Sequence, residues 1–312
     1  MKISILGAGN MATAFATLAR KEDNIVLYSI EDSVTIDINK FHKNLKYLDC
    51  KLEENITATN NLNDALKDSE IVIFSIPSVA FRTICEKSKG LVSKNAIIMI
   101  LTKGIEEESG KTMSEIANEY FSNEIVIVAG PSIANEIAKK ILSFVVFASK
   151  SNKAIEKCKS IFSKEYYDIL ASKDVFGAET CSFLKNAYAI YLGIIDGLGY
   201  GINTKAGIFI KVLNEMKLFC EKLGVKNETV YSLAGLGDLL VTGFSVYGRN
   251  KKFGELIAKG ESIQSAKRII GQTIEGIIAL KVAKELFDKK GINAPILEKT
   301  YSIIFLNTKP SI

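Results

Sequence analysis

The sequence predicts an α/β fold with two domains: a doubly wound domain over residues 1–172 and an all-helical domain over residues 173–312. Short β-branched apolar runs alternate with helix-like segments as far as about residue 149, whereas helical spacing alone follows residue 174. The chain length of 312 residues agrees with two domains, since single hydrophobic cores stop growing near about 250–300 residues.

Six apolar runs are the predicted strands of the first domain. They cover residues 3–6, 25–28, 71–75, 96–101, 125–128 and 144–147, and a further short run covers 167–170. Each run is apolar on both faces, which is typical of a parallel sheet covered by helices on both sides. Pro77, Gly104 and Gly130 follow three of the runs closely, at the carboxyl edge where such sheets bind ligands.

The second domain is predicted from helical spacing. Apolar residues recur at i, i+3 and i+4 within 183–192, 208–220, 253–258, 277–287 and 296–305. The glycine-rich segment 234–250 is too polar and too interrupted to be helical throughout.

Composition excludes several classes of protein. A net charge of +5, from 40 basic and 35 acidic residues, lacks the clustered excess of a nucleic-acid binder. No apolar run approaches the ~18–20 residues of a membrane span, so we expect no membrane insertion. Five widely spaced cysteines without a C-x-x-C pair suggest free thiols and a cytoplasmic protein. The single histidine, His42, excludes a histidine-rich metal site, and we expect no metal.

Residues 3–12 contain a nucleotide-binding pattern. An apolar run is followed by G-x-G-x-x-A and then by helix-forming residues. Gly7 permits a tight turn, Gly9 leaves room for a pyrophosphate at a helix N-terminus, and Ala12 is an accepted third residue. The first domain is therefore predicted to be Rossmann-like and to bind a dinucleotide.

Glu31 suggests which dinucleotide is used. It follows the second predicted strand, about 20 residues after the glycines, where a carboxylate accepts hydrogen bonds from the adenosine ribose. Because this charge repels a ribose 2′-phosphate, NAD is favoured over NADP. NADP stays open as the alternative, since Lys40 or Lys43 would attract that phosphate by swinging in from the next loop.

Lysine is the favoured proton donor for a hydride-transfer reaction. Reduction of a ketone needs an acid beside the developing alkoxide, and His42 lies in a polar loop between lysines, which favours a surface position. Lys185 lies in an otherwise apolar helical stretch, where partial burial would lower its pKa. Alternatively, Lys185 has no catalytic role and extends its ammonium from the helix to solvent.

A series of motifs now resembles a known family. They are residues 7–12, I-P-S at 76–78, T-K-G at 102–104, G-P-S at 130–132, L-K-N at 184–186, G-L-G-Y-G at 197–201, A-G-L-G-D at 234–238, G-R-N at 248–250 and G-Q at 271–272. In this order and spacing they resemble the soluble, bacterial-type NAD(P)-dependent glycerol-3-phosphate dehydrogenases. The resemblance runs from Gly7 to about residue 298.

The resemblance implies a reaction and its residues. These enzymes interconvert dihydroxyacetone phosphate and sn-glycerol 3-phosphate, which supplies or consumes the backbone of glycerophospholipids. Lys185 would be the general acid and base, with Lys103 beside it and Asp238 orienting the pair. The implied substrate-binding residues are Lys103, Gly130, Ser132, Asn186, Thr242, Arg249 and Asn250. The implied contacts to NAD or NADP are Gly7, Gly9, Asn10, Met11, Glu31, Pro77, Phe81, Lys103, Ala134, Arg249, Gln272 and Glu275.

Some positions depart from the family or allow two interpretations. Asn10 and Met11 stand where an aromatic residue and a third glycine are common, and Lys211 stands where arginine is common. Arg82 is either functional or part of a surface pair, and Lys205 either contacts the substrate phosphate or is a solvated residue at a helix start. The apolar helices of the second domain would provide a homodimer interface.

Two other functions remain open. One is a β-hydroxyacid or ketoacid dehydrogenase of the same two-domain plan, whose substrate would carry a carboxylate. The other is a non-catalytic nucleotide-sensing module. Lys103, Lys185 and Asp238 together argue against a mere binder, which has no need of three ionisable groups around a hydride acceptor.

Overall fold

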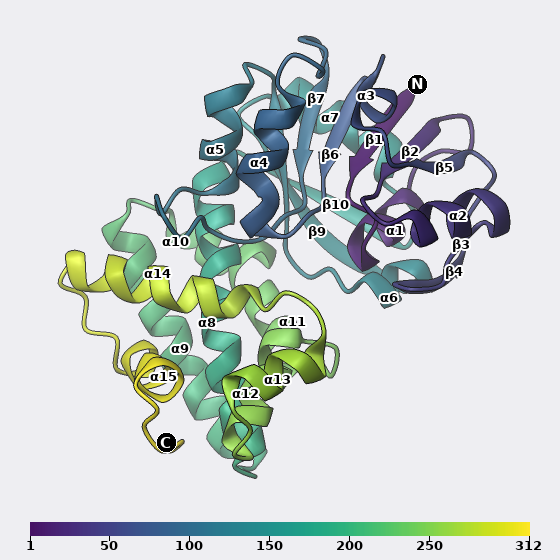
Figure 1. The fold of residues 1–312 in the computed structure, drawn as a ribbon. Helices are drawn as coiled ribbons and strands as arrows, with labels where there is room; N and C mark the ends of the chain where they lie inside the picture. The colour runs from purple at the N-terminus through teal and green to yellow at the C-terminus, as the bar shows by residue number, and fades with distance from the viewer. The chain divides into compact units, whose positions relative to one another are not determined.

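The computed structural model describes residues 1–312 as two compact units (Figure 1). The first comprises Met1–Thr102 and Met113–Val175, and the second comprises Lys103–Thr112 and Phe176–Ile312. The chain leaves the first unit for the last time after Val175, three residues beyond the expected boundary at residue 172. The linear division did not anticipate that Lys103–Thr112, in the middle of the first domain's sequence, belongs to the second unit.

The first unit contains an eight-stranded sheet with strand order β10-β9-β8-β7-β6-β1-β2-β5. Its strands are β1 (Lys2–Leu6), β2 (Asn24–Tyr28), β5 (Ile56–Thr59), β6 (Ile71–Phe74), β7 (Ile97–Ile100), β8 (Ile125–Ala129), β9 (Ser143–Ala148) and β10 (Tyr167–Ser172). All six predicted runs and the short run at 167–170 are strands of this sheet. The edge strand β5 and the two-stranded hairpin of β3 (Lys43–Asn44) and β4 (Leu48–Lys51) were not predicted.

The sheet is parallel except between β8 and β9, which pair antiparallel. A parallel neighbour needs a crossover that returns the chain to the opposite edge of the sheet. The only helix between these strands is the five-residue α6 (Ala134–Ala138), and the chain runs straight back from the edge where β8 ends. The expectation of a fully parallel sheet was therefore wrong at this one pairing.

Helices cover both faces of the sheet, as a doubly wound fold requires. They are α1 (Asn10–Ala16), α2 (Asp32–Phe41), α3 (Leu62–Leu66), α4 (Ser78–Ser88), α5 (Met113–Tyr120), α6 and α7 (Asn152–Phe162). On one face the ring of Phe15 from α1 lies 4.7 Å from that of Phe162 from α7. On the other face Phe81 of α4 lies 5.1 Å from Phe74 of β6.

Strand β1 lies between β2 and β6, and the strand order reverses between β1 and β6. The chain builds β1, β2 and β5 outward in one direction and then returns to place β6 on the other side of β1. Ligands of open α/β sheets bind beyond the carboxyl ends of the strands at such a reversal. Gly7 follows β1 directly, so the predicted glycine loop lies at this point.

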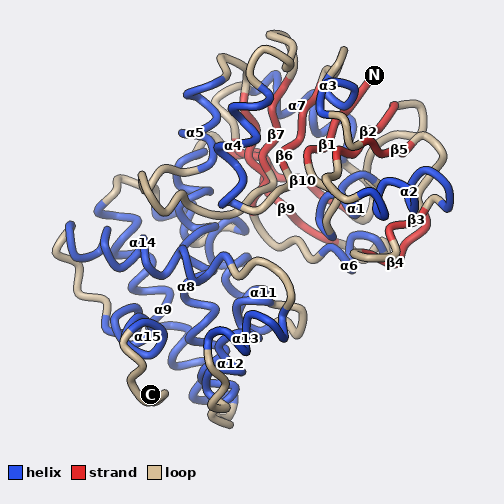
Figure 2. Tube along the Cα trace, in the orientation of Figure 1, coloured by secondary structure: helices blue, strands red, loops and turns tan.

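The second unit is helical, and Figure 2 shows no strand within it. An isolated β-bridge joins Ile105 and Thr112 in its loop segment Lys103–Thr112. Its helices are α8 (Val175–Gly197), which starts one residue before the unit boundary, α9 (Ile202–Lys222), α10 (Asn227–Val230), the π-helical turn η1 (Leu233–Gly237), α11 (Asp238–Phe244), α12 (Arg249–Ala258), α13 (Ile263–Ile270), α14 (Glu275–Lys289) and α15 (Pro295–Phe305). The segment 234–250 is more helical than expected, because only residues 245–248 interrupt it.

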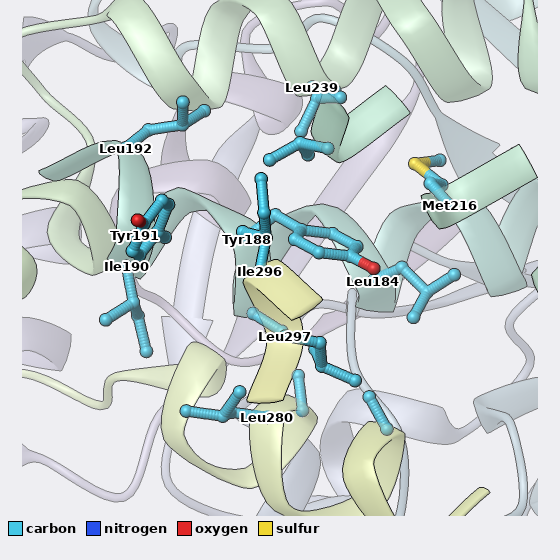
Figure 3. Close-up of a cluster of buried hydrophobic side chains, with 14 of the residues drawn as sticks. Leu184, Tyr188, Ile190, Tyr191, Leu192, Met216, Leu239, Leu280, Ile296 and Leu297 are labelled. Carbon is cyan, nitrogen blue, oxygen red and sulfur yellow. The ribbon is translucent and has the colours of Figure 1, made fainter. Parts of the chain in front are cut away.

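Helix α8 forms the centre of the second unit. Every residue from Gly177 to Ile195 is buried, which is typical of a helix surrounded by other helices. Figure 3 shows side chains from its apolar sequence packed among those of four further helices. The contacting side chains are Leu184, Tyr188 and Leu192 of α8, Met216 of α9, Leu239 of α11, Leu280 of α14, and Ile296 and Leu297 of α15.

Helices α8 and α12 approach to backbone contact because glycines line their interface. A Cβ at Gly193 would lie 1.9 Å from the backbone oxygen of Lys251, and a Cβ at Gly254 would lie 2.0 Å from that of Ile190. Gly197 makes a similar approach to α12, with Glu255 as the neighbour. No other residue type fits at these positions without separating the two helices.

No single helix is long and apolar enough to cross a membrane. The bent pair Asn227–Phe244 and Arg249–Ala258 reaches the necessary length and hydropathy only when its two parts are joined. This pair contains the buried polar residues Asp238 and Asn250.

Replacing Gly254 by alanine should destabilise the second unit. The new Cβ would meet the backbone of α8, which cannot move aside without disturbing its other contacts, so we expect a loss of about 3 kcal/mol in the free energy of unfolding. Urea unfolding followed by circular dichroism measures this change.

Gly207→Ala in α9 is the matched control, because nothing lies within 4 Å of its Cβ position. At that exposed helical position alanine should raise the free energy of unfolding by about 0.5–1 kcal/mol or leave it unchanged. A Gly254→Ala protein as stable as the control would contradict the backbone contact between α8 and α12.

Candidate active site

A buried carboxylate holds two lysines in the second unit. Lys185 of α8 donates hydrogen bonds to Asp238 Oδ1 at 2.5 Å and to Thr242 Oγ1 at 2.8 Å. Lys103 donates to the other oxygen, Asp238 Oδ2, at 2.9 Å. Asp238 is the first residue of α11 and follows the π-helical turn η1 without a break. The structure thus brings together three predicted site residues, the farthest pair 135 residues apart in sequence.

The two lysines differ in their access to water. Lys185 is buried, whereas the side chain of Lys103 keeps 19% of its surface exposed. Lys103 reaches the site because the segment Lys103–Thr112 belongs to the second unit. One lysine is therefore enclosed among apolar side chains, and the other lies between the carboxylate and solvent.

Burial changes the acidity of Lys185. Loss of solvation lowers the pKa of its ammonium to about 8, from an ordinary value of 10.5. Asp238 raises the pKa and so limits the fall, while the positive charge of Lys103 lowers it further. Lys185 is consequently charged at pH 7 but releases its proton far more readily than a surface lysine.

Two buried amides connect this cluster to the neighbouring helices. Asn250 Nδ2 of α12 donates to Asn186 Oδ1 of α8 at 2.9 Å, and the Gly276 N–H of α14 donates to Asn250 Oδ1 at 2.9 Å. Asn186 Nδ2 in turn donates to the backbone oxygen of Lys103 at 3.4 Å. These bonds hold the middle of α8, the starts of α12 and α14, and the Lys103 segment in one arrangement.

The predicted phosphate-binding group lies at the start of α12. Arg249 is exposed, and its Nη1 donates to Gln272 Oε1 at 3.3 Å. Glu275, at the start of α14, interacts electrostatically with the same guanidinium. Arg249, Gln272 and Glu275, all predicted cofactor contacts, therefore lie together within the second unit.

In the first unit, the glycine loop makes a tight turn and leaves open space at the start of α1. Gly7 has a φ of 108°, and a Cβ there would lie 2.4 Å from the backbone oxygen of Ser75. Gly9 precedes α1 as its N-cap, with nothing within 4 Å of its Cβ position, and Asn10 and Met11 begin the helix. Open space beside the unpaired amides at the start of a helix fits the phosphates of a dinucleotide.

Sequence reasoning missed Asn44, which holds the glycine loop from behind. Its fully buried Nδ2 donates to the backbone oxygen of Ala8 at 2.8 Å and to Thr13 Oγ1 at 2.7 Å. The residue ends β3 and fixes the β3–β4 hairpin to the loop. A single polar residue in a two-residue strand gives no sequence signal of this role.

The carboxylate of Glu31 is engaged by the turn of the same hairpin. Lys46 forms an ion pair with Glu31 Oε2, and the Tyr47 hydroxyl donates to Oε1. These interactions hold the pKa of Glu31 below its usual value, the hydrogen bond from Lys46 having the largest effect. Lys46 occupies the position for which the sequence suggested Lys40 or Lys43.

The remaining predicted contacts lie along the carboxyl edge of the sheet or behind it. Pro77 precedes α4 as its N-cap, Gly130 follows β8 with a φ of 91°, and Ala134 begins α6. Ser132 donates to the backbone oxygen of Gly130 at 3.1 Å. Phe81, a predicted cofactor contact, is fully buried, and its ring packs against Phe74 of the sheet as a core side chain.

Two residues with open interpretations have charged partners. Arg82 forms an ion pair with Glu119, and its guanidinium lies 5.9 Å from the ring centroid of Tyr120. Lys205 forms an ion pair with Asp196 at the end of α8. No group of three or more histidine, cysteine, aspartate or glutamate side chains is placed to hold a metal ion.

Two family models together match nearly the whole chain. They describe the N-terminus of NAD-dependent glycerol-3-phosphate dehydrogenase, over residues 2–155, and its C-terminus, over residues 174–312. The chain belongs to this family. The family resemblance drawn from the sequence motifs and the expected fold class, a Rossmann-like domain followed by a helical one, are confirmed.

Curated members of the glycerol-3-phosphate dehydrogenase family match the full chain. A glycerol-3-phosphate dehydrogenase [NAD(P)+] from a Thermoanaerobacter species is 40% identical over 311 residues, covering 99% of this chain and 94% of the relative. One from Clostridium tetani is 38% identical, covering 97% and 88%. The crystal structure of the Coxiella burnetii enzyme has a TM-score of 0.95 at 29% identity, covering 99% of this chain and 96% of that structure.

A more distant likeness concerns the fold alone. A ketopantoate reductase from Ralstonia eutropha has a TM-score of 0.65 at 16% identity, covering 98% of both chains. The fold of this chain is therefore shared with a ketopantoate reductase.

Asn250→Ala should lower stability as well as disturb the site. It leaves Asn186 Oδ1 and the Gly276 N–H without their buried partner, for which we expect a loss of about 2 kcal/mol in the free energy of unfolding. Urea unfolding measures the loss. Asn203→Ala, an exposed position on α9, is the control and should change stability by less than about 0.5 kcal/mol. Equal effects of the two substitutions would contradict the bridging role of Asn250.

Proposed function

We propose that the chain catalyses the reversible reduction of dihydroxyacetone phosphate to sn-glycerol 3-phosphate with NADH or NADPH. Family membership supports the reaction. The burial of Lys185 beside Asp238 and Lys103 supports Lys185 as the proton donor of this reaction. A small phosphorylated three-carbon substrate suits an exposed arginine, Arg249, whose neighbour Asn250 is hydrogen-bonded to the residue after Lys185.

The glycine loop would hold the cofactor, which when bound supplies hydride to the carbonyl carbon or accepts it from the alcohol. The amides at the start of α1 would bind the pyrophosphate, with Gly9, Asn10 and Met11 closest to it. Glu31 would accept hydrogen bonds from the adenosine ribose, which favours NAD. We keep Pro77 and Ala134 of the first unit, and Lys103, Arg249, Gln272 and Glu275 of the second, as proposed cofactor contacts.

Lys185 would move the proton. As hydride reaches the carbonyl carbon, negative charge develops on the oxygen, and a buried ammonium beside it stabilises that charge and then donates its proton. A pKa of about 8 suits both directions, since the group is mostly protonated for reduction and easily deprotonated for oxidation. Lys103 would add a second positive charge, and Asp238 would keep both ammonium groups in position.

The substrate phosphate would bind at the start of α12. The guanidinium of Arg249 presents paired N–H groups that match phosphate oxygens. Thr242 and Asn250 already contact Lys185 and Asn186, so we propose that they assist by holding those side chains as well as by contacting the substrate. Gly130 and Ser132 complete the proposed substrate contacts.

We place the enzyme in the cytoplasm as a homodimer. All five cysteines are free and four are buried, which suits a reducing compartment. Exposed apolar side chains on α11 and α13, Leu240 and Ile269 among them, support an interface between two copies.

Lys185→Met tests the proposal directly. Methionine keeps the length of the buried side chain but supplies no proton, so we expect kcat for reduction of dihydroxyacetone phosphate to fall about 10²–10⁴-fold. The loss of NADH absorbance measures the rate, and circular dichroism establishes that the variant is folded.

Lys217→Met serves as the control, since Lys217 forms a partly exposed ion pair with Glu221 on α9, away from the lysine cluster. It should retain wild-type activity. Folded wild-type protein that oxidises neither NADH nor NADPH with this substrate would overturn the proposed reaction. Turnover of a carboxylate-bearing ketone instead would favour the hydroxyacid dehydrogenase, and absence of any turnover would favour the nucleotide-sensing module.

A further inference from the structure

The β3–β4 hairpin places a lysine at the ribose end of the proposed cofactor site. The Gly7 N–H donates to the backbone oxygen of Tyr28 at 2.9 Å, which joins the glycine loop to the end of β2. Glu31 follows three residues later and precedes α2. Lys46 and Tyr47 lie in the turn of the hairpin, and both donate to the Glu31 carboxylate.

The hairpin is fixed rather than loosely placed. Asn44 holds it against the glycine loop through the backbone oxygen of Ala8, and Leu48 is buried at the start of β4. Tyr47 is partly buried against the core of the first unit, and the Lys46 ammonium lies 5.4 Å from the centroid of its ring. The start of the Lys46 side chain is therefore anchored beside Glu31.

The ammonium itself remains accessible. The Lys46 side chain is 53% exposed and that of Glu31 is 28% exposed. The pair carries one positive and one negative charge, so the ribose end of the site has no net charge from these two residues. A carboxylate alone would repel a 2′-phosphate, which carries about −1.5 to −2 charges at pH 7, whereas a free ammonium would attract it.

We propose that Lys46 determines the use of NADP alongside NAD. When a ribose 2′-phosphate is present, the Lys46 ammonium moves away from Glu31 and binds that phosphate. With NAD, Lys46 stays on Glu31, and the carboxylate accepts hydrogen bonds from the ribose hydroxyls. This inference rests on the cofactor site of the proposed function, and it adds a residue that sets the cofactor preference.

Lys46→Gln is the test, read by isothermal titration calorimetry so that the result does not depend on turnover. The variant should bind NADPH about tenfold more weakly while its dissociation constant for NADH stays within about twofold. The fragments adenosine 2′,5′-bisphosphate and adenosine 5′-monophosphate should show the same contrast. Glu31→Gln, which removes the competing carboxylate, should strengthen NADPH binding.

Lys51→Gln is the matched control, an exposed lysine at the end of β4 in the same hairpin. It should leave both dissociation constants unchanged. An effect equal to that of Lys46→Gln would show that NADPH binding depends only on the net charge of the hairpin, which would overturn the proposal. Equal weakening of NADH and NADPH by Lys46→Gln, or no weakening of either, would also overturn it.

The outcomes separate this inference from the proposed function. A wild-type protein that reduces dihydroxyacetone phosphate, with cofactor binding indifferent to Lys46, contradicts the inference alone. A protein whose NADPH binding depends on Lys46 but which does not reduce that substrate contradicts the reaction alone. A wild-type protein that binds neither dinucleotide contradicts both.

Discussion

Helices α8 and α12 touch along their backbones because Gly193, Gly197 and Gly254 carry no side chains at the interface. This contact sets the spacing between two helices that both carry residues of the candidate site. Lys185 and Asn186 lie on α8, while Arg249 and Asn250 begin α12. The hydrogen bond between the two asparagines then fixes the relative position of the helix segments that contain the proposed acid and the proposed phosphate ligand.

The central position of α8 explains why a lysine there has unusual acidity. A charged group surrounded by apolar side chains is costly unless it is paired, and Asp238 provides the pairing. The same carboxylate holds Lys103, so three ionisable groups carry one net positive charge. Asp238 thereby keeps Lys185 charged enough to act as an acid, while burial and Lys103 keep the ammonium ready to release its proton.

Much of the fold could be predicted, because apolar patterns report burial directly. The central strands of the first unit are buried on both faces, and their continuous apolar runs identified them. Edge strand β5 alternates buried and exposed residues over only four positions, and β3 has two residues, so neither gave a signal. The excursion of Lys103–Thr112 into the second unit depends on tertiary packing, which no local pattern reports.

The candidate site was predictable to the extent that motifs carry it. Lys185 was named from its apolar helical stretch, and Lys103 and Asp238 were named through the family resemblance. The convergence of both lysines on the Asp238 carboxylate required the structure. Asn44 and Lys46 were missed because their importance comes from the hairpin that places them, not from their neighbours in sequence. The ring of Phe81, by contrast, is turned into the core, which a motif match cannot reveal.

The pKa of Lys185 decides whether this side chain can serve as the proton donor. Nuclear magnetic resonance of protein with nitrogen-labelled lysine follows its Nζ through a pH titration, and Lys185→Met identifies the signal by its loss. We expect the ammonium to lose its proton with a midpoint at about pH 8, so that it is charged below that pH and neutral above it. A midpoint near the ordinary value of 10.5 would contradict this picture of Lys185, because burial would then have left its acidity unchanged.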